Sequence, residues 1–169
     1  MTQRVYLIGY MGSGKSTMGR WIAEAMNWNF IDLDHYIENK YHKTIPQIFE
    51  EDGETHFRKI ESICLKEVSD IENIIIGAGG GTPCFFDNME LMNQTGLSIY
   101  LHLTPQVVFD RLMTSKNKRP LIEGKSGEEL LQFIIEKLEE RELYYNKAQV
   151  IAEGATWTVE DFLKAIRGA

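Results

Sequence analysis

A glycine-rich run near the start of the chain constrains the fold more than any other feature. Residues 9–16 read G-x-x-x-x-G-K-S. The run follows the apolar stretch 5–8, which predicts a short buried strand. It precedes apolar residues spaced at i, i+3, i+4, i+7 and i+8 from Met18, which predict an amphipathic helix. A strand, a glycine loop and a helix in this order are the context that the phosphate-binding P-loop pattern requires.

The residue types of this run suit a triphosphate. Glycines at 9, 12 and 14 let the backbone curl its N–H groups around phosphate oxygens, and the following helix directs its free N–H groups at the same anion. Lys15 supplies a positive charge for the β- and γ-phosphates, and Ser16 supplies a hydroxyl for Mg²⁺. The alternative is a glycine-rich turn followed by an accidental Lys-Ser. The pattern predicts a nucleotide site and leaves open what happens to the phosphate.

Composition excludes several classes of partner. The 169 residues carry a formal net charge of −7, which argues against nucleic acid and anionic membranes, and no apolar run approaches the length of a membrane span. Cys64 and Cys84 show neither disulfide-framework nor metal-ligand spacing, and residues 1–4 lead straight into the first strand without a signal peptide. We therefore expect a cytoplasmic protein, and a monomer by default.

Predicted strands alternate with predicted helices along the whole chain. This alternation predicts one α/β domain over residues 1–169, a three-layer α/β/α sandwich with a central parallel sheet of about five strands, of the P-loop NTPase type. Three helix starts carry the side-chain caps Thr44, Ser126 and Thr158. The expected strands are 5–8, 30–34, 73–76, 97–103 and 149–152, and the helices after the first include 35–41, 54–69, 87–95, 104–114 and 126–147.

Polar and glycine-rich segments follow three of these strands at their carboxyl ends, where ligands bind in parallel sheets. They are the P-loop, the pair Asp32 and Asp34, and a second glycine loop at 77–83. On an extended strand, both carboxylates would point to the same side. One could serve Mg²⁺, and the other could orient an acceptor hydroxyl and take its proton. The alternative is a helix N-cap at Asp34 and a solvated turn at Asp32.

Three arginines are candidates for anion binding. Arg58 and Glu61 are spaced i, i+3, so they form either an exposed ion pair or a pair in which Glu61 aims Arg58 at an anionic acceptor. Arg141 lies on the long helix among acidic residues, and its role is equally open. Arg119 lies in a basic loop at about 115–125, which we expect either to close over the triphosphate as a lid or to be a solvated loop.

Taken together, these motifs resemble the shikimate kinase family, small P-loop kinases of the nucleoside-monophosphate-kinase-like fold, over essentially the whole chain. The resemblance rests on the order and spacing of six motifs: G-x-M-G-S-G-K-S-T at 9–17, D-x-D at 32–34, F-R-x-x-E at 57–61, G-G-G at 79–81, R-P-L at 119–121 and R-x-x-x-Y-x-x-A at 141–148. It implies transfer of the ATP γ-phosphate to the 3-hydroxyl of shikimate, a step toward chorismate and the aromatic amino acids.

The resemblance also implies a role for each matching residue. Lys15, Asp34 and Arg119 would be catalytic. Ser16 and Asp32 would hold Mg²⁺. The ATP site would be formed by Gly12, Ser13, Gly14, Lys15, Ser16, Thr17, Arg119 and, near adenine, Arg111. Shikimate would be held by Asp34, Arg58, Gly79, Gly80, Gly81 and Arg141, with the two arginines on its carboxylate and Gly80 offering a backbone N–H.

Two other classes of function stay open at this point. Another small-molecule P-loop kinase, for gluconate or a nucleoside monophosphate, would share the donor half of the site. A monophosphate acceptor asks for several phosphate-clamping arginines, and the expected acceptor-binding segment at about 34–69 offers chiefly Arg58. A catalytically silent nucleotide-binding module would be expected to have lost Lys15, Asp34 or Arg119, and the chain carries all three.

Overall fold

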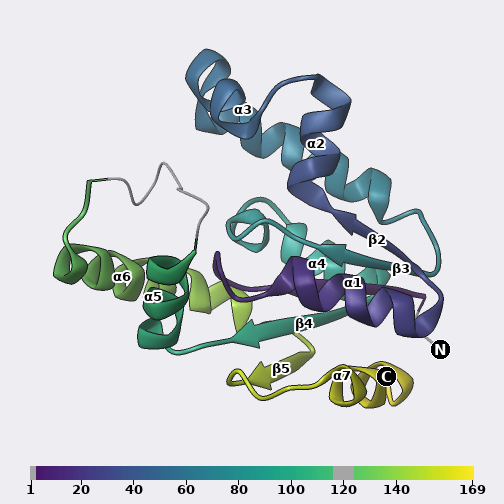
Figure 1. The fold of residues 1–169 in the computed structure, drawn as a ribbon. Coiled ribbons are helices and arrows are strands. Elements are labelled where there is room, and N and C mark those ends of the chain that lie inside the picture. Colours follow the sequence, from purple (N-terminus) through teal and green to yellow (C-terminus); the bar gives the residue numbers. More distant parts are fainter. Residues whose placement is uncertain (1–2, 116–123) are drawn as a thin grey trace.

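The computed structural model describes residues 3–115 and 124–169. Its centre is a five-stranded sheet in the order β2-β3-β1-β4-β5, with every neighbouring pair parallel (Figure 1). Since β1 lies between β3 and β4, the loop after β1 leaves the middle of the sheet. The predicted α/β sandwich is confirmed. The strands are β1 (Arg4–Ile8), β2 (Asn29–Asp32), β3 (Ile74–Gly77), β4 (Leu97–His102) and β5 (Val150–Glu153).

Helices connect the strands, as parallel pairing requires. Among the described helices, none is long and apolar enough to cross a membrane. The helices are α1 (Lys15–Met26), α2 (Leu33–Tyr41), α3 (Ile45–Val68), the short 3₁₀ turn η1 (Thr82–Cys84), α4 (Asn88–Thr95), α5 (Pro105–Thr114), α6 (Gly127–Tyr145) and α7 (Val159–Arg167).

The two faces of the sheet bury separate cores because side chains alternate along each strand. In β1, Val5 and Leu7 face a core that includes residues of α1 and α7. Tyr6 and Ile8 face the opposite core, built with α2, α3, α4, α5 and α6. The central strands β1, β3 and β4 are therefore covered on both sides, which explains why they are mostly apolar along their length.

Side-chain caps begin three of the helices where the sequence predicts them. Thr44, Ser126 and Thr158 each form a complete capping box with the residue three positions on. Gly53 breaks α3 into two parts, because its backbone has the non-helical dihedrals φ 79° and ψ 169°. Figure 1 shows α2 and the first part of α3 standing away from the sheet on the β2 side, facing α5 and α6.

The prediction of a strand continuing to Asp34 is wrong. β2 ends at Asp32, and Leu33 begins α2, so Asp34 lies in the first helical turn. The side chain of Asp32 caps the helix by accepting hydrogen bonds from the N–H groups of Asp34 and His35. The N-cap is thus Asp32 and not Asp34, and the two carboxylates are placed by a strand-to-helix turn rather than by strand alternation.

Candidate active site

The first glycine loop forms an open anion cradle at the carboxyl end of β1. Gly12 and Gly14 have φ of 77° and 95°, conformations that residues with a Cβ rarely adopt. Gly14 is the N-cap of α1 and has no side chain, so no side-chain cap competes with an anion for this helix N-terminus. The ammonium of Lys15 donates to the carbonyl oxygens of Gly9 (2.7 Å) and Tyr10 (2.9 Å), so it lies against the loop that it would serve.

Ser16 and Asp32 meet between α1 and β2. The Ser16 hydroxyl donates to Oδ2 of Asp32 at 2.7 Å, while Oδ1 of the same carboxylate caps α2. The two residues predicted to serve Mg²⁺ are therefore in direct contact. A hydroxyl and a carboxylate are hard oxygen ligands, and Mg²⁺ commonly binds one or two carboxylates with waters and substrate phosphates, so this donor set fits the ion.

Asp34 lies close to two other carboxylates. Burial, followed by the negative charges of Asp32 and Glu61, raises the pKa of Asp34 from 3.8 to about 6, against the opposing pull of Lys15. A group with a pKa this close to neutrality can gain and lose a proton under ordinary conditions. Perturbed carboxyl groups of this kind are common at active sites.

The second glycine loop is the point where the predicted acceptor residues come together. A Cβ built on Gly79 would lie 3.0 Å from Oδ1 of Asp34, and one on Gly80 would lie 3.0 Å from Nη1 of Arg141. On Gly81 it would lie 2.5 Å from Nη2 of Arg58. Because each glycine lacks a Cβ, a different predicted acceptor residue can approach the backbone at each of the three positions.

This second loop also lies against the P-loop. A Cβ built on Gly80 would be 3.7 Å from the carbonyl oxygen of Gly9 and from the N atom of Met11. The predicted donor and acceptor sites are therefore neighbours at one edge of the sheet.

Arg58 is held in a buried polar network rather than in an exposed pair. Its Nη1 donates to Glu61 at 2.9 Å, and the side chains of Arg58 and Glu61 are only 11% and 1% exposed. The other oxygen of Glu61 accepts from the hydroxyl of Thr82 at 2.7 Å. The Arg58 guanidinium also lies 4.1 Å from the centre of the Phe85 ring. The surface-pair alternative is therefore excluded, and Thr82 and Phe85 are partners that no sequence motif indicated.

Arg141 comes to the same place from α6. Its guanidinium lies 5.3 Å from the centre of the Tyr10 ring, within the range of a cation–π contact, and beside Gly80. One helical turn later, the Tyr145 hydroxyl donates to the carbonyl oxygen of Gly80 at 2.5 Å. Two arginines from different helices therefore approach the second glycine loop from two sides.

Arg111 lies on the other side of the P-loop. Its Nη1 donates to the carbonyl oxygens of Gly12 (3.3 Å) and Ser13 (3.1 Å). It lines a cavity of about 370 Å³ together with Thr17, Trp21 and Trp157. The two tryptophans had no motif to mark them, because they are brought to the P-loop only by the packing of α1 and the β5–α7 connection.

Arg119, Cys64 and Cys84 remain among the residues that the sequence analysis names. Arg119 and most of the predicted lid lie outside the described residues. Cys64 is buried, and burial raises the pKa of its thiol to about 11. Burial likewise raises the pKa of the Cys84 thiol to about 11, so neither thiol has the low pKa of a reactive cysteine.

A P-loop at the middle of a parallel sheet, with a carboxylate and arginines gathered beside it, defines a P-loop kinase. Known proteins agree. A family model described as shikimate kinase matches residues 11–167. A shikimate kinase of Parabacteroides distasonis is 46% identical over 167 residues, covering 99% of this chain and 96% of that protein. The chain belongs to the shikimate kinase family.

Solved structures give the same result. The crystal structure of shikimate kinase from Bacteroides thetaiotaomicron aligns with a TM-score of 0.90 and 44% identity, covering 99% of this chain and 98% of that one. A shikimate kinase from Acinetobacter baumannii in complex with shikimate aligns with a TM-score of 0.84 and 33% identity, covering 99% and 92%. A gluconokinase from Sinorhizobium meliloti, at 18% identity and a TM-score of 0.55, shares only the fold.

Proposed function

We propose that this chain transfers the γ-phosphoryl group of ATP to the 3-hydroxyl of shikimate, giving shikimate 3-phosphate and ADP on the route to chorismate and the aromatic amino acids. The observation that carries the proposal is the second glycine loop, where Asp34, Arg58 and Arg141 approach three successive glycines beside the P-loop. An acceptor with a carboxylate and a ring hydroxyl suits two guanidinium groups and one carboxylate.

The donor half binds MgATP. The phosphates are surrounded by the N–H groups at the start of α1 and by the backbone of Gly12, Ser13 and Gly14. The ammonium of Lys15 binds the γ-phosphate. Thr17 and Arg111 line the cavity beside the P-loop, which takes the nucleoside, with adenine near Trp157. Ser16 and Asp32 hold Mg²⁺, which when bound would supply positive charge to the β- and γ-phosphate oxygens.

The acceptor half places the hydroxyl that reacts. Arg58 and Arg141 bind the shikimate carboxylate, and the backbone at Gly79, Gly80 and Gly81 forms the wall of the site. Glu61 holds Arg58 in place because its carboxylate is buried and bonded on both oxygens. The acceptor-binding segment is residues 34–69, within a single domain over residues 1–169.

Phosphoryl transfer needs a group that accepts the hydroxyl proton and positive charges that offset the negative charge of the phosphates. The acceptor oxygen forms a bond to the γ-phosphorus as the bond from that phosphorus to the β–γ bridging oxygen breaks, and the hydroxyl proton passes to Asp34. Lys15 and Arg119 offset the negative charge on the transferring group and on the leaving ADP. Arg119 belongs to the lid predicted at 115–125, a role that rests on the sequence alone.

ADP release from MgATP, measured in parallel with shikimate, gluconate and AMP, tests the proposal. We expect turnover with shikimate and only background with the other two. Turnover without shikimate, or with gluconate or AMP instead, would refute it. No turnover with any acceptor would favour a silent nucleotide-binding module.

Two further expectations accompany the function. The enzyme acts as a monomer, since one chain supplies residues for both halves of the site. It works in the cytoplasm, which suits free cysteines with raised pKa values and a substrate set that includes ATP.

A further inference from the structure

The second glycine loop is held in place by hydrogen bonds to the carbonyl oxygens of its three consecutive glycines. The carbonyl of Gly79 accepts from the N–H of Thr82 at 3.1 Å, and that of Gly81 accepts from the N–H of Cys84 at 3.0 Å. Both bonds are made within the loop and η1. The carbonyl between them, on Gly80, accepts instead from the hydroxyl of Tyr145 on α6. The middle peptide of the loop therefore depends on a side chain from a distant helix.

Tyr145 is well placed to hold this peptide rigidly. Its side chain is fully buried, and its ring packs against that of Tyr100 with 4.9 Å between centres. Such packing leaves the hydroxyl little freedom to move. Burial also raises the pKa of the Tyr145 phenol well above its ordinary value of 10, so the hydroxyl keeps its proton and remains a donor.

The same helix brings Arg141 to the same glycine. Arg141 and Tyr145 are four residues apart and so lie on one face of α6. Arg141 reaches the Cα side of Gly80, and Tyr145 reaches its carbonyl. α6 thus fixes the position of Gly80 relative to the arginine that is proposed to bind the acceptor carboxylate.

We propose that Tyr145 is a positioning residue for the acceptor: its hydroxyl sets the orientation of the Gly80–Gly81 peptide and its register with Arg141. The inference rests on the proposed function. A trans peptide is planar, so fixing the Gly80 carbonyl also directs the N–H of Gly81 to the opposite side. The hydrogen bonds at the Gly79 and Gly81 carbonyls do not hold the peptide between them, and glycine restricts its own backbone least. Tyr145 does not touch the reacting atoms, so its loss should weaken acceptor binding more than the chemical step.

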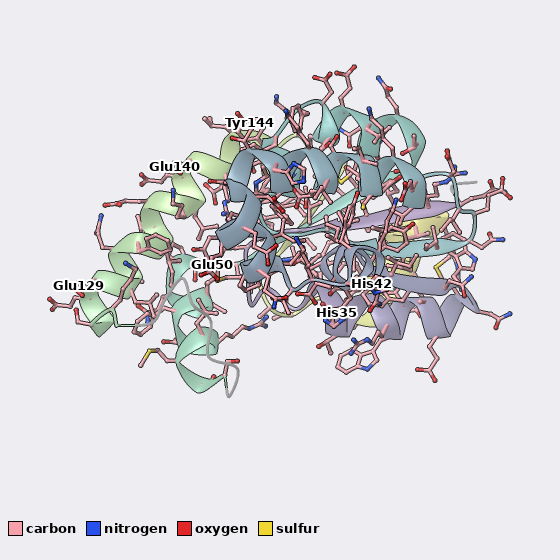
Figure 2. All side chains as sticks on the ribbon, turned by 90° about the horizontal axis from the view of Figure 1, so that it is seen from above. His35, His42, Glu50, Glu129, Glu140 and Tyr144 are labelled. Atoms are coloured by element: carbon pink, nitrogen blue, oxygen red, sulfur yellow. The ribbon has the colours of Figure 1, made fainter. Side chains whose placement is uncertain are left out.

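The substitution Tyr145→Phe tests this because it removes one oxygen and keeps the packed ring. We expect the KM for shikimate to rise about five- to tenfold, the loss of one hydrogen bond, while kcat and the KM for ATP stay within about twofold. The matched control is Tyr144→Phe. Tyr144 is only partly buried on the neighbouring position of α6, and Figure 2 labels it with Glu140 along the margin of the molecule. This control should leave all three constants unchanged.

A second control separates positioning from general loosening of the core. Tyr100 is also buried, but its hydroxyl reaches Glu142 at 3.5 Å rather than the glycine loop. Tyr100→Phe should therefore leave the KM for shikimate within about twofold of wild type, and thermal unfolding reports the stability of both variants.

Four outcomes would overturn the inference. The first two concern Tyr145→Phe alone: an unchanged KM for shikimate, or equal increases in the KM values for shikimate and ATP. The other two compare it with Tyr100→Phe: an equal increase in the KM for shikimate in Tyr100→Phe, or an equal loss of folded protein in Tyr145→Phe and Tyr100→Phe. Wild-type protein is assayed first. If it shows no turnover with shikimate, the proposed function is refuted, and the inference is refuted as well. A wild type that uses shikimate beside an unaltered Tyr145→Phe refutes the inference alone.

Discussion

At the scale of single residues, Asp34 shows most clearly how the site departs from an ordinary surface. Burial and the charges of Asp32 and Glu61 raise its pKa from the usual 3.8 to about 6. A general base works best when its pKa is near the operating pH, so this environment suits a group that takes a proton from a hydroxyl. This environment also destabilises the fold, because ionised Asp34 is buried away from water and is repelled by Asp32 and Glu61.

The pKa of Asp34 predicts the pH dependence of activity. Below about pH 6 the carboxyl is protonated and cannot accept the hydroxyl proton, so kcat/KM for shikimate should fall tenfold per pH unit on the acid side. Asp34→Asn should remove this limb and lower kcat by about 10²- to 10⁴-fold, the usual contribution of general base catalysis. A pH profile of wild type and variant with shikimate as varied substrate measures both effects.

The same variant should be more stable than wild type. A carboxyl whose pKa is raised on folding costs stability as pH rises from about 4 to about 6, and the full cost remains above that range. At pH 7.5 we therefore expect Asp34→Asn to increase the free energy of unfolding by about 1 to 3 kcal/mol. Asp70→Asn, an exposed acid, is the control. Full activity in Asp34→Asn, or reduced stability, would contradict this view of Asp34.

At the scale of elements, the acceptor site is built where α3 and α6 reach the second glycine loop. α3 contributes Arg58 and the buried Glu61 from consecutive turns, and η1 adds Thr82. Because Glu61 satisfies one edge of Arg58, the guanidinium has a fixed direction before any ligand arrives. Such preorganisation reduces the entropy lost on binding.

Arg58→Ala should mainly impair the use of shikimate. Loss of a charged, preoriented carboxylate partner is expected to raise the KM for shikimate by about 100-fold, with the KM for ATP nearly unchanged. The variant also leaves Glu61 buried without its cation, so a lower melting temperature is expected as well. Arg58→Lys keeps the charge without the planar fork and should give an intermediate KM. Parallel loss of ATP affinity would show that Arg58 does not belong to the acceptor half.

Some of these elements could be predicted from sequence, and others could not. The capping boxes at Thr44 and Ser126 are local, so their residues suffice to predict the helix starts. The sequence does not predict the strand-to-helix turn at Asp32, because Leu33 continues an apolar pattern that fits a strand and a buried helix start equally well. The contacts of Thr82 and Tyr145 join segments 21 and 65 residues apart, and no local pattern indicates such pairs.

At the scale of the whole molecule, parallel topology brings the two halves of the site together. The strand order places β1 next to β3, so the loops that follow these strands, each rich in glycine, emerge side by side. Alternation of strands and helices was enough to predict this edge of the sheet. It could not predict that each glycine of the second loop would contact a different predicted acceptor residue, since that depends on side-chain packing of three helices.

The product of the reaction tests the central claim most directly. Wild-type protein is incubated with MgATP and shikimate, and the mixture is followed by ³¹P and ¹H NMR. We predict one new phosphate monoester on the 3-hydroxyl of shikimate, formed in equal amount to ADP. Release of inorganic phosphate without a phosphorylated acceptor, or a phosphate on a different hydroxyl, would contradict the proposed arrangement of donor and acceptor.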